Sequence, residues 1–406
     1  MSILAARIRN VAPSATTAVT RRAAELSAEG RAIIRLSEGE PDFDTPEHVK
    51  DAARAAISAG LTKYTATDGT AELKRAIVEK FKREDGLVYS LDEIIVSTGG
   101  KQVIFNAFLA TVEAGDEVVI PAPYWVSFPE MVRLAGGTPV IVECGEDLDF
   151  KLTVEKLRQV LTPQTKWLVL NNPNNPSGSC YSAEDLHLLS EELLAWPDVL
   201  IMSDDIYEHL IFDGGTHHTI VALEPDLRSR TLLCNGVSKA FAMTGWRIGY
   251  GAGPKELVAA MTTLQSHSTS NPNSIAQEAA RVALTAPMDF LKEQIAIYNE
   301  RRVKCREWLN AIDGLNCANP GGALYLFPCC RGLIGRKTPS GTVIDSDTAL
   351  AAYLLDEAGV AVVPGAAFGL SPFFRISIGE PLERLEDACK AIAAACARLT
   401  TTQPAT

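Results

Sequence analysis

Short hydrophobic runs alternate with longer amphipathic segments along most of the chain. Six runs are rich in aliphatic residues and end in polar ones, at residues 93–97 (EIIVS), 117–123 (EVVIPAP), 138–144 (TPVIVEC), 166–172 (KWLVLNN), 199–205 (VLIMSDD) and 230–236 (RTLLCNG). Runs of this length are typical of strands that are buried on both faces, and helical patterns lie between most of them. The alternation predicts an α/β fold with a largely parallel sheet.

The pattern changes after about residue 285. A long charged helical segment is followed by the run GGALYLFP, another helix and the run FFRISIG. These features predict a second, smaller α+β domain that the C-terminal part forms with the N-terminal arm. We expect an arm and part of the small domain at 1–45, a large domain at 46–285, a small C-terminal domain at 286–399 and a tail at 400–406.

Composition narrows the classes of function. The 406 residues are 47% hydrophobic and 22% charged, as in ordinary globular proteins. A net charge of −12 argues against a nucleic-acid surface, and no apolar run approaches the roughly 20 residues of a membrane-spanning helix. The first 24 residues carry four arginines and no acid, as a transit peptide can. They lack serine richness and run directly into the folded pattern, so a structured arm is preferred.

The spacing of the cysteines and histidines argues against disulfide bonds and against a zinc site. Nine cysteines are scattered without CxxC spacing, and the only close pair is Cys329 and Cys330. That pattern is typical of reduced thiols in a cytoplasmic protein. Six histidines, including His217 and His218, show no zinc-ligand spacing, so no metal site is expected.

The ends of the strand runs carry the candidate chemistry, because ligands of such sheets bind beyond the carboxyl ends of the strands. STGGKQ places Gly99 and Gly100 before a helix that could cradle a phosphate, NNPNNPSG holds Asn175 in a proline-rich turn, and SDDIYEH closes a strand with two acids. The run NGVSKAFAMTGWRIGY isolates Lys239 among small and apolar residues. Such a lysine either extends its ammonium into water or serves as a desolvated nucleophile for Schiff-base chemistry.

Taken together, the motifs resemble one family. The chain resembles the class I pyridoxal-phosphate-dependent aminotransferases of fold type I, and within them the bacterial aspartate aminotransferase subgroup. Nine blocks in the same order carry the resemblance over almost the whole chain: PSATTAV, LSEGEPDFDTP, KYTATDGTAELKRAI, GGKQ, PYWVSFPEM, PNNPSG, SDDIYEHL, SKAFAMTGWRIGY and FRIS. It implies a transaminase that moves the amino group of aspartate to 2-oxoglutarate by a ping-pong mechanism, with Lys239 forming an aldimine with pyridoxal 5'-phosphate.

The resemblance also implies which residues hold the cofactor. Asp204 faces the ring nitrogen, and its spacing to Tyr207 favours it over the rival Asp205. Asn175 and Tyr207 hold the phenolic oxygen, while Trp125 and Ile206 press on the two ring faces. The implied phosphate contacts are Arg247, Ser238 and the backbone of Gly100 and Lys101. Gly236 stands where some relatives have a phosphate-binding serine. Tyr64 reaches the phosphate of a neighbouring subunit, which implies a homodimer with shared active sites.

Two cations are implied in substrate recognition. Arg375, in FFRIS, resembles the arginine that binds the α-carboxylate of the amino acid, with the backbone of Gly39 nearby. Lys101 resembles the subgroup's contact for a second, distal carboxylate. A lysine at a helix N-terminus is electrostatically misplaced unless an anion offsets the helix dipole, which supports that role. Trp125 and Asn175 complete the substrate-binding set.

Two alternatives remain open at this point. The first is an aminotransferase of the same fold that acts on aromatic amino acids or prephenate. Prephenate-active relatives tend to carry a lysine within the segment that here reads PSATT, where this chain has Ala15, which argues against prephenate as a substrate. Glu38 and the PSG turn leave the identity of the oxo-acid acceptor open. The second is a non-catalytic cofactor- or nucleotide-binding module. STGGK lacks the full spacing of a phosphate-binding loop, and no GxGxxG follows the first strand.

Overall fold

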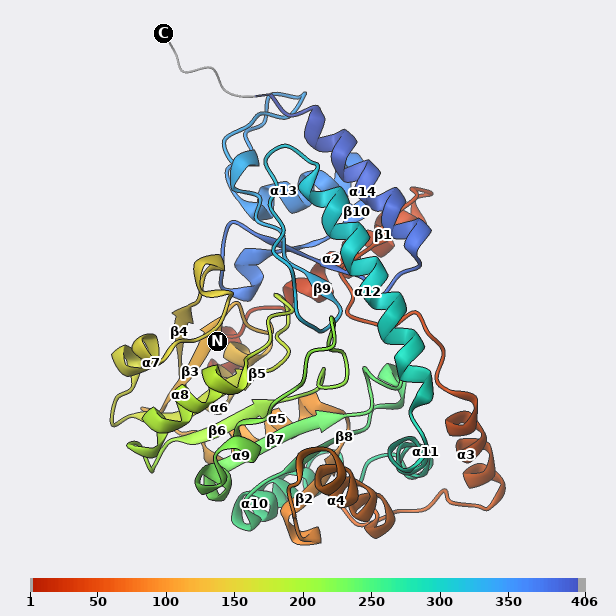
Figure 1. The fold of residues 1–406 in the computed structure, drawn as a ribbon, viewed down its shortest axis with the longest axis vertical. Helices are drawn as coiled ribbons and strands as arrows, with labels where there is room; N and C mark the ends of the chain where they lie inside the picture. The colour runs from red at the N-terminus through yellow and green to blue at the C-terminus, as the bar shows by residue number, and fades with distance from the viewer. Residues whose placement is uncertain (1–2, 401–406) are drawn as a thin grey trace.

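The structure is a computed structural model that describes residues 3–400. Seven strands form the main sheet, in the spatial order β2-β8-β7-β6-β5-β3-β4 (Figure 1). Six of them run in one direction, and β8 is antiparallel to both of its neighbours. The bounds are Ile94–Ser97 (β2), Glu117–Ala122 (β3), Thr138–Glu143 (β4), Thr165–Asn171 (β5), Leu200–Asp204 (β6), Thr231–Gly236 (β7) and Gly249–Ala252 (β8).

The fold prediction is confirmed, with one strand missed. All six predicted runs are strands of this sheet. The seventh, β8, reads GYGA, and its two glycines hide it because glycine weakens the hydrophobic signal of a strand. At Gly249 an added Cβ would lie only 2.1 Å from the backbone nitrogen of Gly100. The glycine is needed there for the close approach of two backbones.

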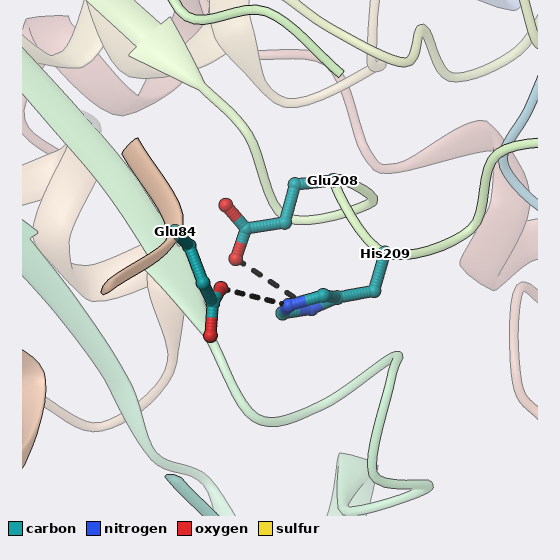
Figure 2. Close-up of side chains that lie close together, drawn as sticks. All are labelled: Glu84, Glu208 and His209. Atoms are coloured by element: carbon teal, nitrogen blue, oxygen red, sulfur yellow. Dashed lines mark hydrogen bonds and ion pairs between the residues drawn. The ribbon is translucent and has the colours of Figure 1, made fainter. Parts of the chain in front are cut away.

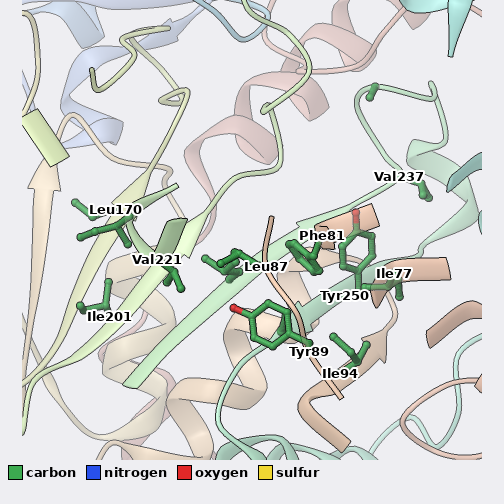
Figure 3. Close-up of a cluster of buried hydrophobic side chains, with 14 of the residues drawn as sticks. Ile77, Phe81, Leu87, Tyr89, Ile94, Leu170, Ile201, Val221, Val237 and Tyr250 are labelled. Carbon is green, nitrogen blue, oxygen red and sulfur yellow. The ribbon is translucent and has the colours of Figure 1, made fainter. Parts of the chain in front are cut away.

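Helices cover both faces of the sheet. Successive strand residues point to opposite faces, so Leu168 and Leu170 of β5 join one buried cluster while Trp167 and Val169 join another. Figure 3 shows part of the first cluster, where Phe81 of α4 packs against β8. The first face is covered by α3 (Glu47–Ser58), α4 (Ala71–Asp85), α8 (Ala183–Leu194), α9 (Ile220–Leu223) and α11 (Ser274–Thr285). The second is covered by α5 (Gly100–Thr111), α6 (Phe128–Ala135) and α10 (Lys255–Ser266).

The N-terminal segment returns to the C-terminal part of the chain. Strand β1 (Ile34–Arg35) pairs in parallel with β10 (Val360–Ala361). An antiparallel sheet beside it has the order β11-β12-β9, with bounds Val363–Pro364, Phe374–Ser377 and Tyr325–Leu326. The helices of this part are α2 (Ala15–Ala28), α12 (Asp289–Asn310), α13 (Asp347–Tyr353) and α14 (Leu382–Ala397). This smaller α+β part is the one that the sequence predicts.

Shorter elements complete the described chain. They are α1 (Ala6–Arg9), α7 (Val154–Val160), the 3-10 turns η1 (Leu91–Glu93), η2 (Glu146–Leu148), η3 (Pro225–Arg230), η4 (Thr244–Trp246), η5 (Arg331–Leu333) and η7 (Gly365–Phe368), and the π-helical turn η6 (Leu354–Ala358). Of the predicted tail, Thr400 pairs with Lys337, and the rest lies outside the described residues. Within residues 3–400, no helix combines the length and the apolar character needed to cross a membrane.

Helix α12 links the two parts (Figure 1). Leu291 near its start belongs to the buried cluster on the main sheet, whereas Leu309 near its end belongs to the cluster of the smaller part. Two consecutive arginines in its middle make two-pronged ion pairs. Arg301 binds Asp42 of the N-terminal segment, and Arg302 binds Asp213 of the loop after β6. The helix therefore ties both segments to one rigid element.

Candidate active site

A cavity of about 340 Å³ lies where the carboxyl ends of the main strands meet the smaller part. Asn171 closes β5 and pairs in register with Asp204, which closes β6. Gly100 begins the helix after β2, and Lys239 lies between β7 and β8. Arg375, from β12, closes the cavity from the other side. Parallel strands bring these distant segments to one edge, as the sequence pattern predicts.

Twelve of the thirteen predicted site residues line this cavity, and one does not. Tyr64 is 92% exposed and lies outside it. Asp205, the rival of Asp204, is also outside the cavity lining. The twelve are Gly39, Gly100, Lys101, Trp125, Asn175, Asp204, Ile206, Tyr207, Ser238, Lys239, Arg247 and Arg375.

The ammonium of Lys239 points into the cavity rather than into bulk water. Its Nζ donates a hydrogen bond to the backbone oxygen of Gly39 at 2.6 Å and lies 5.7 Å from the ring centroid of Tyr207. Within the described residues no carboxylate lies within 4.0 Å of Nζ. A lysine that is not held in an ion pair has an amine that is free to act on a ligand, which suits a nucleophile or a general base.

Asp204 is a buried carboxyl group without a cationic partner at contact distance. Burial is the main cause that raises its pKa to about 7, and the charge of Asp205 adds to the effect. The N–H of Ile206 and the charge of Lys239 oppose the shift. Its backbone oxygen accepts a hydrogen bond from the Asn171 amide at 2.9 Å, which fixes the end of β6. A cation placed against Asp204 would restore its ionised form.

Arg375 is buried, yet its partners are neutral. It donates to Asn175 Oδ1 at 2.8 Å and to the backbone oxygen of Ser37 at 2.6 Å, and its guanidinium lies over the rings of Tyr325 and Phe368. Burial lowers the pKa of Arg375. Its Nε has no hydrogen-bond partner in the described part of the chain. A buried cation of this kind can bind a carboxylate by a charge-assisted contact.

The opposite end of the cavity gathers cations around the start of α5. Gly99 has φ +86°, and an added Cβ would lie 2.4 Å from Arg247 Nη2. Arg247 donates to the backbone oxygen of Thr244 at 2.9 Å. Lys101 Nζ lies 4.9 Å above the Trp125 ring, and burial, Arg247 and Lys239 together lower the pKa of Lys101. Unsatisfied N–H groups at a helix start and two nearby cations form an anion site.

The sequence analysis missed several residues that line the cavity, among them Tyr325, which contacts the predicted residue Tyr207. Its hydroxyl lies 2.7 Å from that of Tyr207, and an added Cβ at Gly39 would lie 1.9 Å from it. Tyr325 stands in the apolar run GGALYLFP, where a tyrosine is expected in the core. Asn171 could have been found, because it closes a strand run as Asp204 does. The missed residues are Ser14, Thr16, Thr17, Ile104, Val126, Ser127, Asn171, Thr244 and Tyr325.

The comparisons with known proteins agree with this geometry. A family profile described as "Aminotransferase class I and II" matches residues 31–392. The chain belongs to this family. The aspartate aminotransferase of Rhizobium meliloti (strain 1021) is 54% identical over 97% of this chain and 96% of its own. The aspartate/prephenate aminotransferase of Cereibacter sphaeroides is 55% identical over 98% of this chain and 100% of its own.

Solved structures of aminotransferases share the fold. The crystal structure of the Rhizobium meliloti aspartate aminotransferase superposes with a TM-score of 0.96 at 54% identity, covering 98% of this chain and 100% of that one. The Thermus thermophilus aspartate aminotransferase with maleate superposes with a TM-score of 0.91 at 43% identity, covering 97% and 100%. The family, the fold and the enzyme class predicted from the sequence are therefore confirmed.

This aminotransferase uses pyridoxal phosphate, as its family does, and the cavity fits that cofactor. Asp204 offers a buried carboxylate for a ring nitrogen. The start of α5 with Arg247 and Lys101 offers an anion site for a phosphate, at a point where glycines leave the space free. Lys239 offers an amine in the same cavity. The donor set thus matches the ring nitrogen, the phosphate and the aldehyde of the cofactor.

Proposed function

We propose that this aminotransferase moves the amino group of aspartate to 2-oxoglutarate, giving oxaloacetate and glutamate. One observation carries the proposal. The cavity holds two separate cations for a substrate, Arg375 and Lys101, and neither has a carboxylate partner in the described residues. A dicarboxylic amino acid can satisfy both. The names of the two relatives described above support the same substrate.

The residues of the cavity have separate roles in the proposed reaction. Bound pyridoxal phosphate supplies an aldehyde that reacts with amines and a conjugated ring that draws electrons from the substrate's α-carbon. Asp204 would hold the proton of the ring nitrogen, and Asn175 and Tyr207 the phenolic oxygen. Trp125 and Ile206 would enclose the ring.

Lys239 would move the proton of the substrate. Its amine would take up the proton of the α-carbon as a general base and hold it for return as a general acid. Arg375 binds the α-carboxylate and thereby fixes the direction in which the C–H bond points. The same residues then serve the second oxo acid in reverse order, which gives ping-pong kinetics.

The choice of a dicarboxylate rests on Lys101. The Lys101 ammonium lies 4.9 Å from the ring centroid of Trp125, and desolvation there together with the neighbouring cations lowers the pKa of Lys101. Such a group gains most when an anion binds beside it. The Thermus thermophilus enzyme was solved with maleate, a small dicarboxylate, which supports the proposal.

A panel of amino donors tests the proposed substrate. Each donor is assayed with 2-oxoglutarate, and we expect kcat/KM for aspartate to exceed that for phenylalanine by at least about tenfold, since one charge-assisted contact contributes roughly 1.5 kcal/mol or more. Parallel double-reciprocal plots are expected for a ping-pong mechanism. Equal kcat/KM values for the two donors would contradict the dicarboxylate proposal.

Prephenate is the second candidate acceptor, because the Cereibacter sphaeroides relative is named for it. In this chain Ser14, Thr16 and Thr17 line the cavity, whereas Ala15 does not. None of these side chains is a cation that could bind the second carboxylate of prephenate. Turnover of aspartate with prephenate measures this capacity directly, and a rate similar to that with 2-oxoglutarate would establish a dual-acceptor enzyme.

We also propose a homodimer in which Tyr64 completes the active site of the other subunit. The support is its exposure of 92%, an unusual position for a tyrosine in a chain with few other exposed aromatic rings among the described residues. Tyr64→Ala and Lys239→Ala are mixed under conditions of proven subunit exchange. About a quarter of the wild-type sites should then become active, because half of the dimers are hybrids with one complete site each. The double variant Tyr64→Ala/Lys239→Ala is the control, and no recovery would exclude shared sites.

A further inference from the structure

Asp205 directly follows Asp204 at the end of β6, but unlike Asp204 it does not line the cavity. It is buried, and its Oδ1 accepts a hydrogen bond from Ser203 Oγ at 2.8 Å. The same oxygen lies 3.7 Å from His217 Nε2. Within the described residues this is the only ion pair that Asp205 makes. His217 is therefore the cation of the described residues that lies against this carboxylate.

His217 is held in place as a donor. Its Nε2 lies 3.2 Å from the backbone oxygen of Asn172, which can only accept, so Nε2 carries a proton. Burial lowers the pKa of His217, but the hydrogen bond and charge of Asp205, with the charges of Glu208 and Asp85, outweigh burial and raise it. The imidazole is therefore more cationic at neutral pH than an exposed one.

Other charged groups of this region have partners of their own. Lys80 of α4 is fully buried and donates to Glu208 at 2.6 Å, with Glu84 and Asp85 each at 3.4 Å. Figure 2 shows His209 between two carboxylates, its Nε2 3.0 Å from Glu84 and its Nδ1 3.6 Å from Glu208.

The spacing of these groups would also suit a metal ion. Glu84, Glu208 and His209 lie close enough together to act as ligands, as do Asp85, Glu208 and His217. However, both ring nitrogens of His209 already face carboxylates, and the ammonium of Lys80 lies against Glu208. The cluster thus supplies its own cations, and His217 is the one that faces Asp205.

The charge on Asp205 reaches Asp204. After burial, it is the largest cause that raises the pKa of Asp204. A cation at His217 offsets that charge, since opposite charges at short range cancel each other's field at a third group. The remaining charged group that acts on Asp204 is Lys239, on the cavity side.

We propose that His217 and Asp205 are positioning residues that set the proton balance of Asp204 from behind the sheet. His217 neutralises Asp205, so that Asp204 stays ionised and can hold the proton of the cofactor's ring nitrogen. The proposal rests on the proposed role of Asp204. It predicts opposite effects for the two partners: without the cation, Asp204 keeps its proton to higher pH, and without the Asp205 charge it loses that proton at lower pH.

The test measures cofactor binding rather than turnover. Apoprotein variants are titrated with pyridoxal phosphate from pH 5 to 9, and Kd is followed by quenching of tryptophan fluorescence. Relative to the unchanged chain, His217→Gln should shift the acid-side loss of affinity upward by about half to one pH unit, and Asp205→Asn should shift it downward by a similar amount. The double variant should return close to the unchanged chain. His218→Gln, the adjacent histidine, is the matched control and should shift nothing.

Asp204→Asn separates this proposal from the proposed function. That variant should bind the cofactor more weakly and lose the acid-side change, because no carboxyl group remains to titrate. If it binds as the unchanged chain does, the role of Asp204 is wrong and the proposal falls with it. If it behaves as expected but His217→Gln and Asp205→Asn shift in the same direction or not at all, the His217 proposal alone is overturned. Should His217→Gln fail to fold, the shift in Asp205→Asn decides.

Discussion

Buried or partly buried cations occur in two settings in this molecule. Outside the cavity, Arg301, Arg302 and Lys80 each contact a carboxylate at 2.6–2.8 Å. Inside the cavity, the described residues place no carboxylate within 4.0 Å of Arg375 or Lys239. Burial does not distinguish the two settings, because Arg375 is 3% exposed and Arg302 is 2% exposed.

The missing counter-ion distinguishes them. A buried cation that contacts a carboxylate contributes to the folded structure, because each charge of the pair is neutralised by the other. One that has only carbonyl or amide acceptors leaves part of its desolvation cost uncompensated until an anion arrives. The cations of the cavity are therefore expected to matter for ligands and little for stability, and the paired ones the reverse.

The largest effect is expected at Lys239. Lys239→Ala should lower kcat by about 10³- to 10⁴-fold or more, because it removes the group that moves the substrate proton. Stability should change by less than about 1 kcal/mol, since one hydrogen bond to Gly39 is lost. Turnover and thermal melting measure the two. Borohydride reduction followed by mass spectrometry should find no covalent cofactor, and label or activity at the wild-type level would contradict the assignment.

Lys80→Met gives the reverse pattern. It leaves Glu208 and Asp85 buried without their cation, so the free energy of unfolding at pH 7.5 should fall by about 3–5 kcal/mol. Urea unfolding followed by circular dichroism measures the loss. A variant as stable as the unchanged chain would show that the pair contributes nothing to stability. It would contradict the expectation that paired buried cations stabilise the fold.

Arg375→Ala should harm every amino donor. The loss of a two-pronged contact with the α-carboxylate should lower kcat/KM by about a hundredfold or more, for aspartate and phenylalanine alike. Stability should stay the same or rise, because an incompletely paired buried cation is removed. Arg302→Ala is the matched control and should lose stability instead, while kcat/KM stays unchanged below its melting temperature.

Lys101→Ala sharpens the comparison within the cavity. If Lys101 meets the distal carboxylate, kcat/KM for aspartate should fall by about ten- to a hundredfold, from a contact worth roughly 1.5–3 kcal/mol, while phenylalanine is barely affected. Steady-state kinetics with both donors give the ratio. Equal losses for the two donors would assign Lys101 to the cofactor phosphate instead.

The smallest effect is expected at Asp85, where burial raises the pKa to about 6 despite the nearby Lys80. Because this folded-state pKa lies above the ordinary value of 3.8, ionisation of Asp85 costs stability as the pH rises from about 4 to 6. Asp85→Asn should therefore stabilise the protein by about 1–2 kcal/mol at pH 7.5 and hardly at all at pH 4. Urea midpoints at the two pH values measure the difference, and a loss at pH 7.5 would show that the ion pair with Lys80 dominates.

The sequence is sufficient for features that are local in the chain. Lys239, Asp204 and Arg375 each stand in a short distinctive block, and the strand pattern brings the blocks to one edge of the sheet. Tyr325 and the cluster around Lys80 could not be predicted, because they depend on contacts between segments with no marker of their own. Lys80 and Glu208 are separated by 128 positions, and nothing in either helix or loop indicates the other.

Strand β8 could not be predicted from its own residues either. Its glycines allow the backbones to pack closely, but they lack the hydrophobic side chains that predict a strand. Tyr64 is the opposite case. Its block resembles that of the family, but the described chain leaves the side chain exposed, so the role proposed for it requires a second subunit.

The pairing of the first short strand with a late one has a consequence for synthesis of the chain. β1 at Ile34–Arg35 finds its partner only at Val360–Ala361, and Ser37 meets Arg375 across 338 positions. At about 5–20 residues per second, a ribosome needs on the order of tens of seconds to supply these partners after the first strand has emerged. The main sheet has all of its strands much earlier. We therefore expect that the main sheet of the nascent chain forms while β1 of the N-terminal arm is still unpaired.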